Sequence, residues 1–289
     1  MKRIGITLGD VAGIGPEVVE QALKSSELPR EVGFVVIGEY PQSQPGHPTA
    51  ETARAAAAAL EEAVAQALAC SIDAVVTGPI HKARMYEIGF RFPGQTEFFA
   101  DRCGVENFAM LLTGAKLTVA LVTTHIPLRR VADALSKDEI VRVGLLLHDF
   151  LRSRGIEKPR IAVAGLNPHA GESGAIGIEE KQLITPAVAQ LREQLDGQAN
   201  VAGPFSPDTI FYHAAAGDWD GVVCMYHDQG LIPLKLHAFH EGVNVTLGLP
   251  FPRTSPDHGT AFEIAGKGIA RPDSMIAAMK LAAELASKR

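Results

Sequence analysis

Three histidines each come shortly after an apolar run that has the composition of a buried strand. The runs are 117–122, 160–166 and 221–225, and the histidines are His125, His169 and His227. Open α/β sheets bind their ligands at the carboxyl ends of the strands, where side chains from separate strands converge. Three neutral imidazoles with an open coordination position suit a divalent metal, above all zinc. A single histidine among ten is more often structural, but three in equivalent places favour a metal site.

Carboxylates accompany two of these histidines. Asp228 directly follows His227, and Glu172 comes three positions after His169. A carboxylate next to a metal-bound imidazole fixes its tautomer and orientation. Asp228 and Glu172 are therefore candidates for that supporting role.

Two cations lie further along the chain. Lys235 comes eight positions after His227, and Arg253 stands in the run 249–255. Arginine binds phosphate or carboxylate as a two-pronged fork, whereas lysine adds a point charge and can act as an acid or base. Both could be ordinary surface residues, but their closeness to the His-Asp pair and to Asn244 favours an anion site.

The segment Gly9–Glu17 is a glycine-rich turn between a predicted strand and a predicted helix. Helix N-termini bind phosphate, but this turn matches neither the dinucleotide fingerprint nor the P-loop. Pro16 falls in the first helical turn, so close strand-to-helix packing explains the glycines at least as well.

Bulk composition excludes several classes of function. The chain has 289 residues, 46% hydrophobic and 21% charged, with a net charge of −6 and no basic cluster for nucleic acid or an anionic membrane. No apolar run approaches the roughly 18 residues of a membrane span. Three scattered cysteines give no disulfide framework, and the N-terminus lacks a signal-peptide pattern, so we expect a cytoplasmic protein.

The order of elements predicts an α/β fold with a largely parallel sheet covered on both faces. Helical periodicity is expected at 49–69, 136–154, 179–195 and 272–287, and strands at 3–8, 33–38, 73–78, 117–123, 160–165, 221–225 and 243–247. Ser136 and Glu139 have the spacing of a capping box. No linker marks a sequential boundary, so two domains would share the chain by crossing over.

Six stretches resemble the 4-hydroxythreonine-4-phosphate dehydrogenase family, in that family's order and nearly its spacing. They are 77–82, 93–99, 123–129, 166–172, 226–235 and 242–261. The resemblance covers almost the whole chain. It implies an isopropylmalate dehydrogenase-like fold with two α/β domains flanking a cleft. The first would be residues 1–95 with 254–289 on the cofactor side, and the second 96–253 on the metal, substrate and dimer side.

The resemblance also implies roles for particular residues. The metal ligands would be His125, His169 and His227, with the site at the interface of a homodimer. The substrate would be bound by Gln95, Thr96, Lys235, Asn244 and Arg253. Lys235 and Asp228 would be the catalytic residues. The cofactor would be bound by His258, Gly259, Thr260 and Ala261.

The implied reaction is metal-dependent oxidation of 4-(phosphooxy)-L-threonine by NAD, with NADP possible. The product is a 3-oxo acid that decarboxylates to 3-amino-2-oxopropyl phosphate, in pyridoxine phosphate biosynthesis. Zinc is the expected ion, with magnesium or cobalt as alternatives. Arg271 could meet the 2′-phosphate of NADP or could face solvent near a helix start.

Two departures from the family pattern concern the substrate and the first domain. Gln95 replaces the usual histidine, and a glutamine amide can donate to phosphate but carries no charge. The region 39–48 is shorter than usual. A sister dehydrogenase of threonate or erythronate 4-phosphate is therefore an alternative, beside a zinc hydrolase and a binding protein without turnover.

Overall fold

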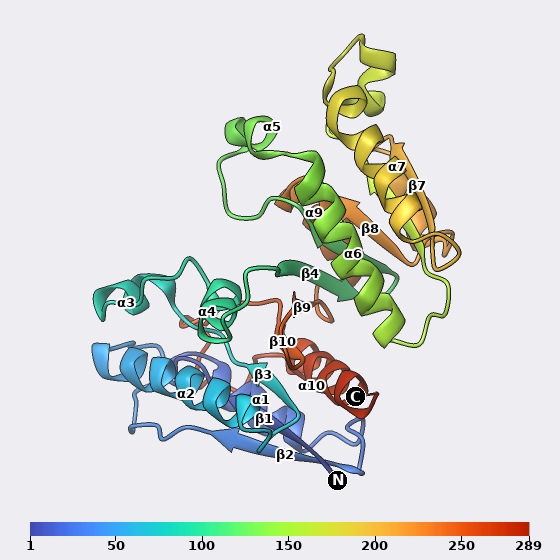
Figure 1. Ribbon diagram of the computed structural model, residues 1–289. Coiled ribbons are helices and arrows are strands. Elements are labelled where there is room, and N and C mark those ends of the chain that lie inside the picture. Colours follow the sequence, from blue (N-terminus) through green and yellow to red (C-terminus); the bar gives the residue numbers. More distant parts are fainter. Residues whose placement is uncertain (289) are drawn as a thin grey trace. The chain divides into compact units, whose positions relative to one another are not determined.

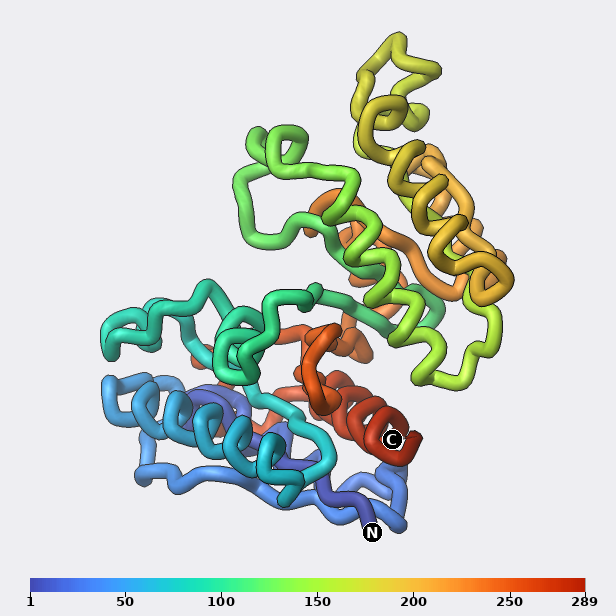
Figure 2. Tube along the Cα trace, viewed as in Figure 1, coloured from blue at the N-terminus to red at the C-terminus, as the bar shows by residue number. Residues whose placement is uncertain are grey.

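A computed structural model describes residues 1–288 and divides the chain into two compact units. Unit 1 comprises Met1–Glu106 and the C-terminal segment that begins at His240, and unit 2 is Asn107–Phe239. The chain therefore leaves unit 1 once and returns once, so that blue and red segments both belong to unit 1 (Figure 2). Unit 1 takes in residues 96–106 and 240–253, which the sequence-based boundaries assign to the other domain.

The sheet of unit 1 has five strands (Figure 1). In spatial order they are β2 (Val32–Ile37), β1 (Lys2–Thr7), β3 (Ala74–Thr77), β10 (Arg253–Pro256) and β9 (Val243–Leu247). The first four run parallel to one another, and β9 is antiparallel to β10. Strand β3 and the last four residues of β1 are fully buried, as expected where helices cover both faces.

Five helices accompany this sheet: α1 (Gly15–Leu23), α2 (Ala50–Leu68), α3 (Lys82–Glu87), α4 (Gln95–Arg102) and α10 (Asp273–Ser287). Val75 packs in one core with α2, whereas Thr254 of β10 donates a hydrogen bond to the carbonyl of Ala278 in α10. Val75 and Thr254 point to opposite faces, because Val75 pairs with Arg253 and neighbouring residues alternate. Helices α2 and α10 therefore cover opposite faces of the sheet.

The sheet of unit 2 also has five strands. In spatial order they are β4 (Ala109–Gly114), β5 (Leu117–Leu121), β8 (Gly221–Cys224), β6 (Arg160–Ala164) and β7 (Asn200–Phe205). Strand β4 is antiparallel to β5, and the other pairings are parallel. The strands β5, β8 and β6 therefore end at the same edge of the sheet.

The helices of unit 2 cover both faces of its sheet. They are α5 (Val131–Ala134), α6 (Lys137–Ser153), α7 (Thr185–Gln194), α8 (Ile210–Ala215) and α9 (His227–Ala238), with a π-helix at Glu180–Ile184 and 3₁₀ segments at Leu128–Arg130 and Pro168–Gly174. Val222 of β8 packs with α8 and α9, whereas a side chain at Gly221 would meet Leu147 of α6. The two helix layers therefore lie on opposite sides of β8.

The α/β fold expected from the sequence is confirmed, and so are its long helices. Ser136 caps α6 by accepting a hydrogen bond from the backbone of Glu139, and Thr49 caps α2 together with Thr52. The helix expected at 179–195 begins with the π-helix and becomes α-helical only at Thr185. Among the described residues no helix is long and apolar enough to cross a membrane.

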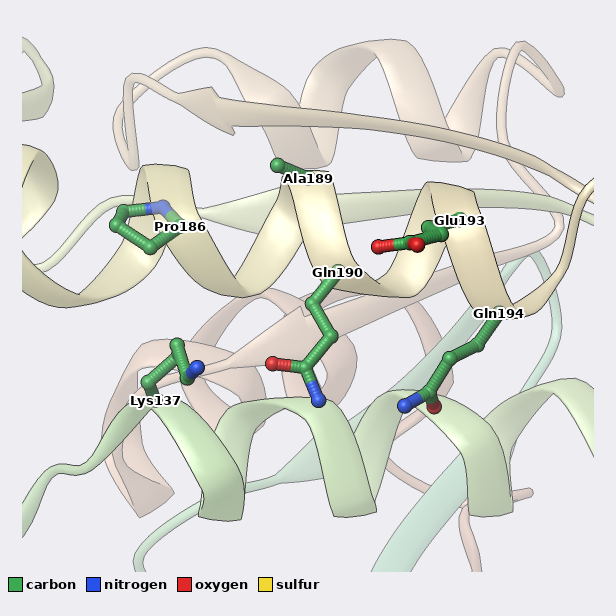
Figure 3. Close-up of a pocket in the computed structure, with 6 residues that line it drawn as sticks. All are labelled: Lys137, Pro186, Ala189, Gln190, Glu193 and Gln194. Carbon is green, nitrogen blue, oxygen red and sulfur yellow. The ribbon is translucent and has the colours of Figure 1, made fainter.

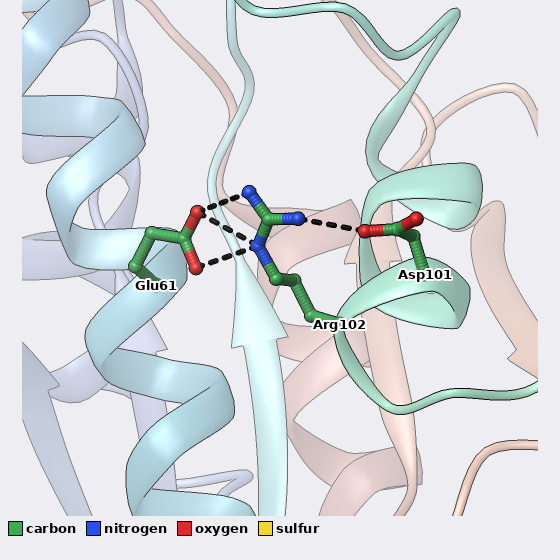
Figure 4. A network of polar contacts seen from close by, with 3 residues as sticks. All are labelled: Glu61, Asp101 and Arg102. Carbon is green, nitrogen blue, oxygen red and sulfur yellow. Dashed lines mark hydrogen bonds and ion pairs between the residues drawn. The ribbon is translucent and has the colours of Figure 1, made fainter.

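Helix α4 is fixed to α2 by the side chain of Arg102 (Figure 4). The guanidinium donates to both carboxylate oxygens of Glu61 at 2.8 to 2.9 Å and to Asp101 at 2.6 Å. It also lies 5.4 Å from the ring of Phe92 and 5.2 Å from that of Phe98. The two-pronged hydrogen bonding to the Glu61 carboxylate and the contacts with two aromatic rings hold the Arg102 side chain in one orientation.

We expect Arg102→Met to lower the free energy of unfolding by about 1 kcal/mol, because the fork on Glu61 and the aromatic contacts disappear together. Arg84→Met is the matched control, since Arg84 makes an exposed ion pair with Glu87 within one helix. Urea denaturation of both variants measures the difference. Equal losses would show that Arg102 contributes no more than an ordinary surface pair.

Candidate functional site

The strand ends that precede the three histidines are tied together by buried hydrogen bonds. After β5, Thr123 Oγ1 donates to the carbonyl of Met225, which follows β8, at 2.8 Å. Gln229 accepts from the Met225 N–H and donates to the Gly165 carbonyl at the end of β6, both at 2.7 Å. Gln229 is 5% exposed, so these bonds are shielded from water. Three adjacent strands are thereby fixed at one edge.

Two of the predicted metal ligands lie next to each other at this edge. The ring centroids of His125 and His227 are 5.5 Å apart. His227 Nδ1 is 2.7 Å from Asp228 Oδ1, which leaves Nε2 as the nitrogen directed away from that carboxylate. An imidazole held by a carboxylate through one nitrogen is the usual arrangement of a metal-binding histidine. The donor set of these two rings therefore fits a divalent ion.

His169 lies on the turn after β6 and is not part of that pair. Within residues 1–288 no three His, Cys, Asp or Glu side chains are grouped closely enough to hold a metal ion. The structure therefore brings two of the three expected ligands together, and the convergence of all three stays a prediction. Glu172 is exposed on the same turn as His169.

Lys235 lies two turns after His227 on α9 and is partly buried. Its ammonium group is 5.8 Å from the ring centroid of Phe239, near the end of the same helix. Helix α9 therefore carries one expected metal ligand, the carboxylate Asp228 and the expected acid or base.

In unit 1 the predicted substrate residues gather around Arg253. Arg253 of β10 pairs with Thr246 of β9, and antiparallel partners point to the same face. Its Nη1 donates to Thr246 Oγ1 at 3.2 Å and to Asn244 Oδ1 at 3.5 Å, and its Nη2 donates to Thr77 Oγ1 at 2.5 Å. The order β3, β10, β9 therefore surrounds the guanidinium with neutral oxygens.

Helix α4 supplies the other two predicted substrate residues. Gln95 Oε1 accepts from Arg253 Nη2 at 2.8 Å, and its Nε2 donates to the carbonyl of Gly78 at 3.0 Å. Thr96 is 3% exposed and shares a hydrogen bond of 3.3 Å with Thr246. Gln95, Thr96, Asn244 and Arg253, separated by up to 158 positions, thus form one cluster.

The charge of Arg253 has no direct counter-charge in this cluster. The residue is 3% exposed, its Nε has no hydrogen-bond partner, and no carboxylate of residues 1–288 is paired with it. Burial lowers the pKa of its guanidinium to about 9, and the charge of Glu97 opposes this shift only in part. A buried cation held only by neutral groups favours an anionic ligand, which would offset the cost of desolvation.

The expected cofactor loop, His258–Ala261, lies against the glycine-rich turn of unit 1. Ile14 N–H donates to the carbonyl of Thr260 at 2.9 Å, and a Cβ on Gly13 would lie 2.6 Å from that oxygen. The predicted close packing between strand and helix is seen at Gly15 of α1, where a Cβ would lie 1.9 Å from the carbonyl oxygen of Leu8, directly after β1. Gly259 is exposed, and a Cβ there would meet no atom within 4 Å, so the loop is open at this position and its role in cofactor binding stays a prediction.

Arg271 is engaged by a neighbouring carboxylate at the start of α10. Its Nε and Nη2 donate to the two oxygens of Asp273 at 3.0 and 3.2 Å. Of the two interpretations of this residue, the one as a solvent-facing residue at a helix start matches these contacts, because its side chain is 60% exposed.

A hollow between α6 and α7 is separate from the predicted site residues (Figure 3). It is lined by Lys137, Pro186, Ala189, Gln190, Glu193 and Gln194. None of the predicted metal, substrate or cofactor residues borders it. It therefore adds nothing to the candidate site.

Sequence reasoning missed the residues that hold the predicted ones in place. Thr77 and Thr246 support Arg253, and Gln229 joins the strand ends near the histidines. Thr77 and Thr246 stand in apolar strands, where a polar residue was the available signal. Gln229 lies in the polar first turn of α9 and gave no such signal.

The chain matches known proteins over its whole length. A sequence model described as pyridoxal phosphate biosynthetic protein PdxA matches residues 11–282. The chain is 44% identical to a 4-hydroxythreonine-4-phosphate dehydrogenase of Desulfosudis oleivorans, over 98% of this chain and 96% of the relative. It is 47% identical to one of Maricaulis maris, over 100% and 99%.

Solved structures agree with the sequence comparison. The 4-hydroxythreonine-4-phosphate dehydrogenase of Klebsiella pneumoniae superposes with a TM-score of 0.83 at 39% identity, over 99% of this chain and 100% of that one. Isocitrate dehydrogenase of Methylococcus capsulatus, at 16% identity over 98% and 84%, has a TM-score of 0.53 and shares the fold alone. The expected isopropylmalate dehydrogenase-like fold is confirmed, and the chain belongs to the PdxA family of pyridoxal phosphate biosynthetic proteins.

Proposed function

We propose that this protein oxidises 4-(phosphooxy)-L-threonine with NAD or NADP in a metal-dependent reaction. The product is a 3-oxo acid that decarboxylates to 3-amino-2-oxopropyl phosphate, a step of pyridoxine phosphate biosynthesis. Relatives with 44% and 47% identity carry the name of this dehydrogenase. The observation that carries the proposal is the buried guanidinium of Arg253, which is hydrogen-bonded only to neutral oxygens and therefore favours an anion such as a phosphate or carboxylate.

The residues of the chain divide the work. Arg253, Asn244 and Thr96 bind and orient the anionic substrate, while Gln95 holds Arg253 in place. Lys235 takes the proton of the substrate hydroxyl, and Asp228 orients His227. His125, His169 and His227 would hold a divalent ion, which would supply Lewis-acid chemistry, and His258–Ala261 would hold NAD, which would supply the hydride acceptor. Imidazole donors favour zinc over magnesium, with cobalt as a substitute.

The proposed assembly is a homodimer that completes the metal site. Helix α9 exposes Ile232, Leu236 and Phe239, at 69%, 83% and 67% of their surfaces. Their spacing of three to four residues places them along one stripe of the helix. An apolar stripe on the helix that carries His227 fits a subunit interface. Three free cysteines fit a reducing, cytoplasmic location.

The direct test follows NADH formation with three substrates: 4-(phosphooxy)-L-threonine, threonate 4-phosphate and erythronate 4-phosphate. We expect the first to give the highest kcat/KM, and a chelator to abolish activity until zinc or cobalt is restored. His169→Ala should reduce turnover by at least 100-fold while leaving the fold intact. Activity that survives the chelator would contradict the metal role.

The sugar acid phosphates remain the second candidate because of Gln95. Its amide is held between Arg253 and Gly78, so it brings no charge to the substrate as a histidine could. A higher kcat/KM with threonate or erythronate 4-phosphate would identify that compound as the substrate in place of 4-(phosphooxy)-L-threonine. The reaction class would be unchanged.

Arg253 gives a separate prediction on anion binding. Inorganic phosphate should raise the melting temperature of the wild type, because a ligand at 100 times its Kd stabilises by about 2.7 kcal/mol. Arg253→Met should lose this phosphate-dependent shift, and the exposed Arg84→Met should keep it. Differential scanning fluorimetry compares each variant with and without phosphate. A full shift in Arg253→Met would contradict the assignment.

The apolar stripe of α9 can be tested as the dimer interface by mutation. Leu236→Glu places a charge in the apolar stripe and should convert the dimer to monomers, with loss of zinc binding. Leu68→Glu is the control, since Leu68 is 50% exposed at the end of α2. Sedimentation velocity measures the mass. A dimer of unchanged stability in Leu236→Glu would place the interface elsewhere.

A further inference from the structure

The turn that carries His169 has an unusual backbone. His169, Ala170, Gly171, Glu172 and Ser173 all have positive φ, between 41° and 76°. A left-handed conformation costs a residue with a Cβ about 1–2 kcal/mol, and runs of such residues are rare. Four of these five residues carry a Cβ. The surrounding structure must therefore impose this conformation.

The buried carboxylate of Glu180 makes the contacts that anchor this turn. Its Oε1 accepts hydrogen bonds from the backbone N–H groups of Leu166 and Asn167 at 2.8 and 2.7 Å. Its Oε2 accepts from Asn167 Nδ2 at 2.9 Å. Glu180 is 3% exposed, so water does not compete for these bonds. The carboxylate thus fixes Leu166 and Asn167, the two residues directly before Pro168.

Glycines leave the room that this carboxylate needs. A Cβ on Gly171 would lie 2.5 Å from Glu180 Oε2, and one on Gly165 would lie 3.2 Å from Oε1. A Cβ on Gly177 would lie 2.2 Å from Asn167 Nδ2. Glu180 therefore fills the inside of the loop between β6 and α7, and the turn is wrapped around it.

The helix start on the other side of Glu180 is also irregular. Thr185 N–H donates to the Glu180 carbonyl across five residues, which makes this segment a π-helix. Pro186 has no N–H and its ring disfavours a regular α-helical turn before it. Such π segments often occur at functional sites. Here the segment begins with the residue that anchors the turn of His169.

We propose that Glu180 is a positioning residue that holds His169 in the orientation required for the metal site. The role of His169 rests on the proposed function, whereas the hold of Glu180 on the turn does not. Glu180 acts through the backbone of Leu166 and Asn167 and touches neither substrate nor metal. Without Glu180 the turn can leave its left-handed conformation. Metal binding must then restore the orientation of the His169 imidazole, which lowers the affinity for the metal.

The experiment uses the full chain with three variants. Glu180→Ala removes every acceptor, Glu180→Gln keeps one oxygen for the two backbone N–H groups, and Glu193→Ala is the control on exposed α7 surface. Hydrogen exchange of the peptide 166–178 is measured on metal-free protein. Zinc affinity is measured by competition with a chromophoric chelator, and kcat and KM are measured with zinc restored.

We expect Glu180→Ala to exchange faster in peptide 166–178 only, and to bind zinc about 10- to 100-fold more weakly. Glu180→Gln keeps one acceptor oxygen and loses the other, so it should lie between Glu180→Ala and the wild type in both properties. Glu193→Ala should match the wild type. If Glu180→Ala does not fold, a Glu180→Gln variant with wild-type exchange and zinc affinity overturns the proposal. Normal exchange and affinity in Glu180→Ala overturns it as well.

A wild type that binds no zinc, or a His169→Ala variant with normal zinc affinity, would defeat the proposed function instead. In that case the exchange data still show whether Glu180 holds the turn. The two failures are therefore distinguishable.

Discussion

The burial of one positive charge governs the arrangement of unit 1. Arg253 is held by oxygens from two flanking strands and one helix, namely Thr77 of β3, Thr246 and Asn244 of β9, and Gln95 of α4. Removing any of these elements would leave the guanidinium buried with fewer partners, which is strongly unfavourable. The partners of Arg253 therefore depend on the strand order β3, β10, β9. They also depend on the position of α4, which Arg102 holds against α2.

Unit 2 uses the opposite charge for a similar purpose. There a buried carboxylate, Glu180, collects backbone N–H groups, and a buried amide, Gln229, joins the ends of β6 and β8. Arg253 is positioned by neutral oxygens, which leaves its charge available to an anion. His227 is instead held by the carboxylate of Asp228 through Nδ1, which leaves Nε2 available to a ligand.

The sequence predicted the fold class and most strands because continuous apolar runs and caps are local signals. Ser136 and Thr49 begin their helices where side-chain chemistry requires it. It did not predict β4, β7 or β10, since β10 is short and polar and owes its place to its neighbours. The left-handed turn at His169 was equally hidden, because four of its five residues carry a Cβ and such residues rarely adopt positive φ. The cluster around Arg253 came from the family resemblance, and its contacts came from pairing across the sheet.

The chain enters unit 2 at residue 107 and returns to unit 1 at residue 240, which has a consequence for its synthesis. Translation delivers all of Asn107–Phe239 before β9, β10 and α10 leave the ribosome. Unit 2 can therefore fold as a contiguous stretch, while the half-built sheet of unit 1 must wait with β3 as an open edge. Arg253, which carries the buried charge, is thus among the last residues to be synthesised. Its strand β10 then pairs with β3 and covers the open edge.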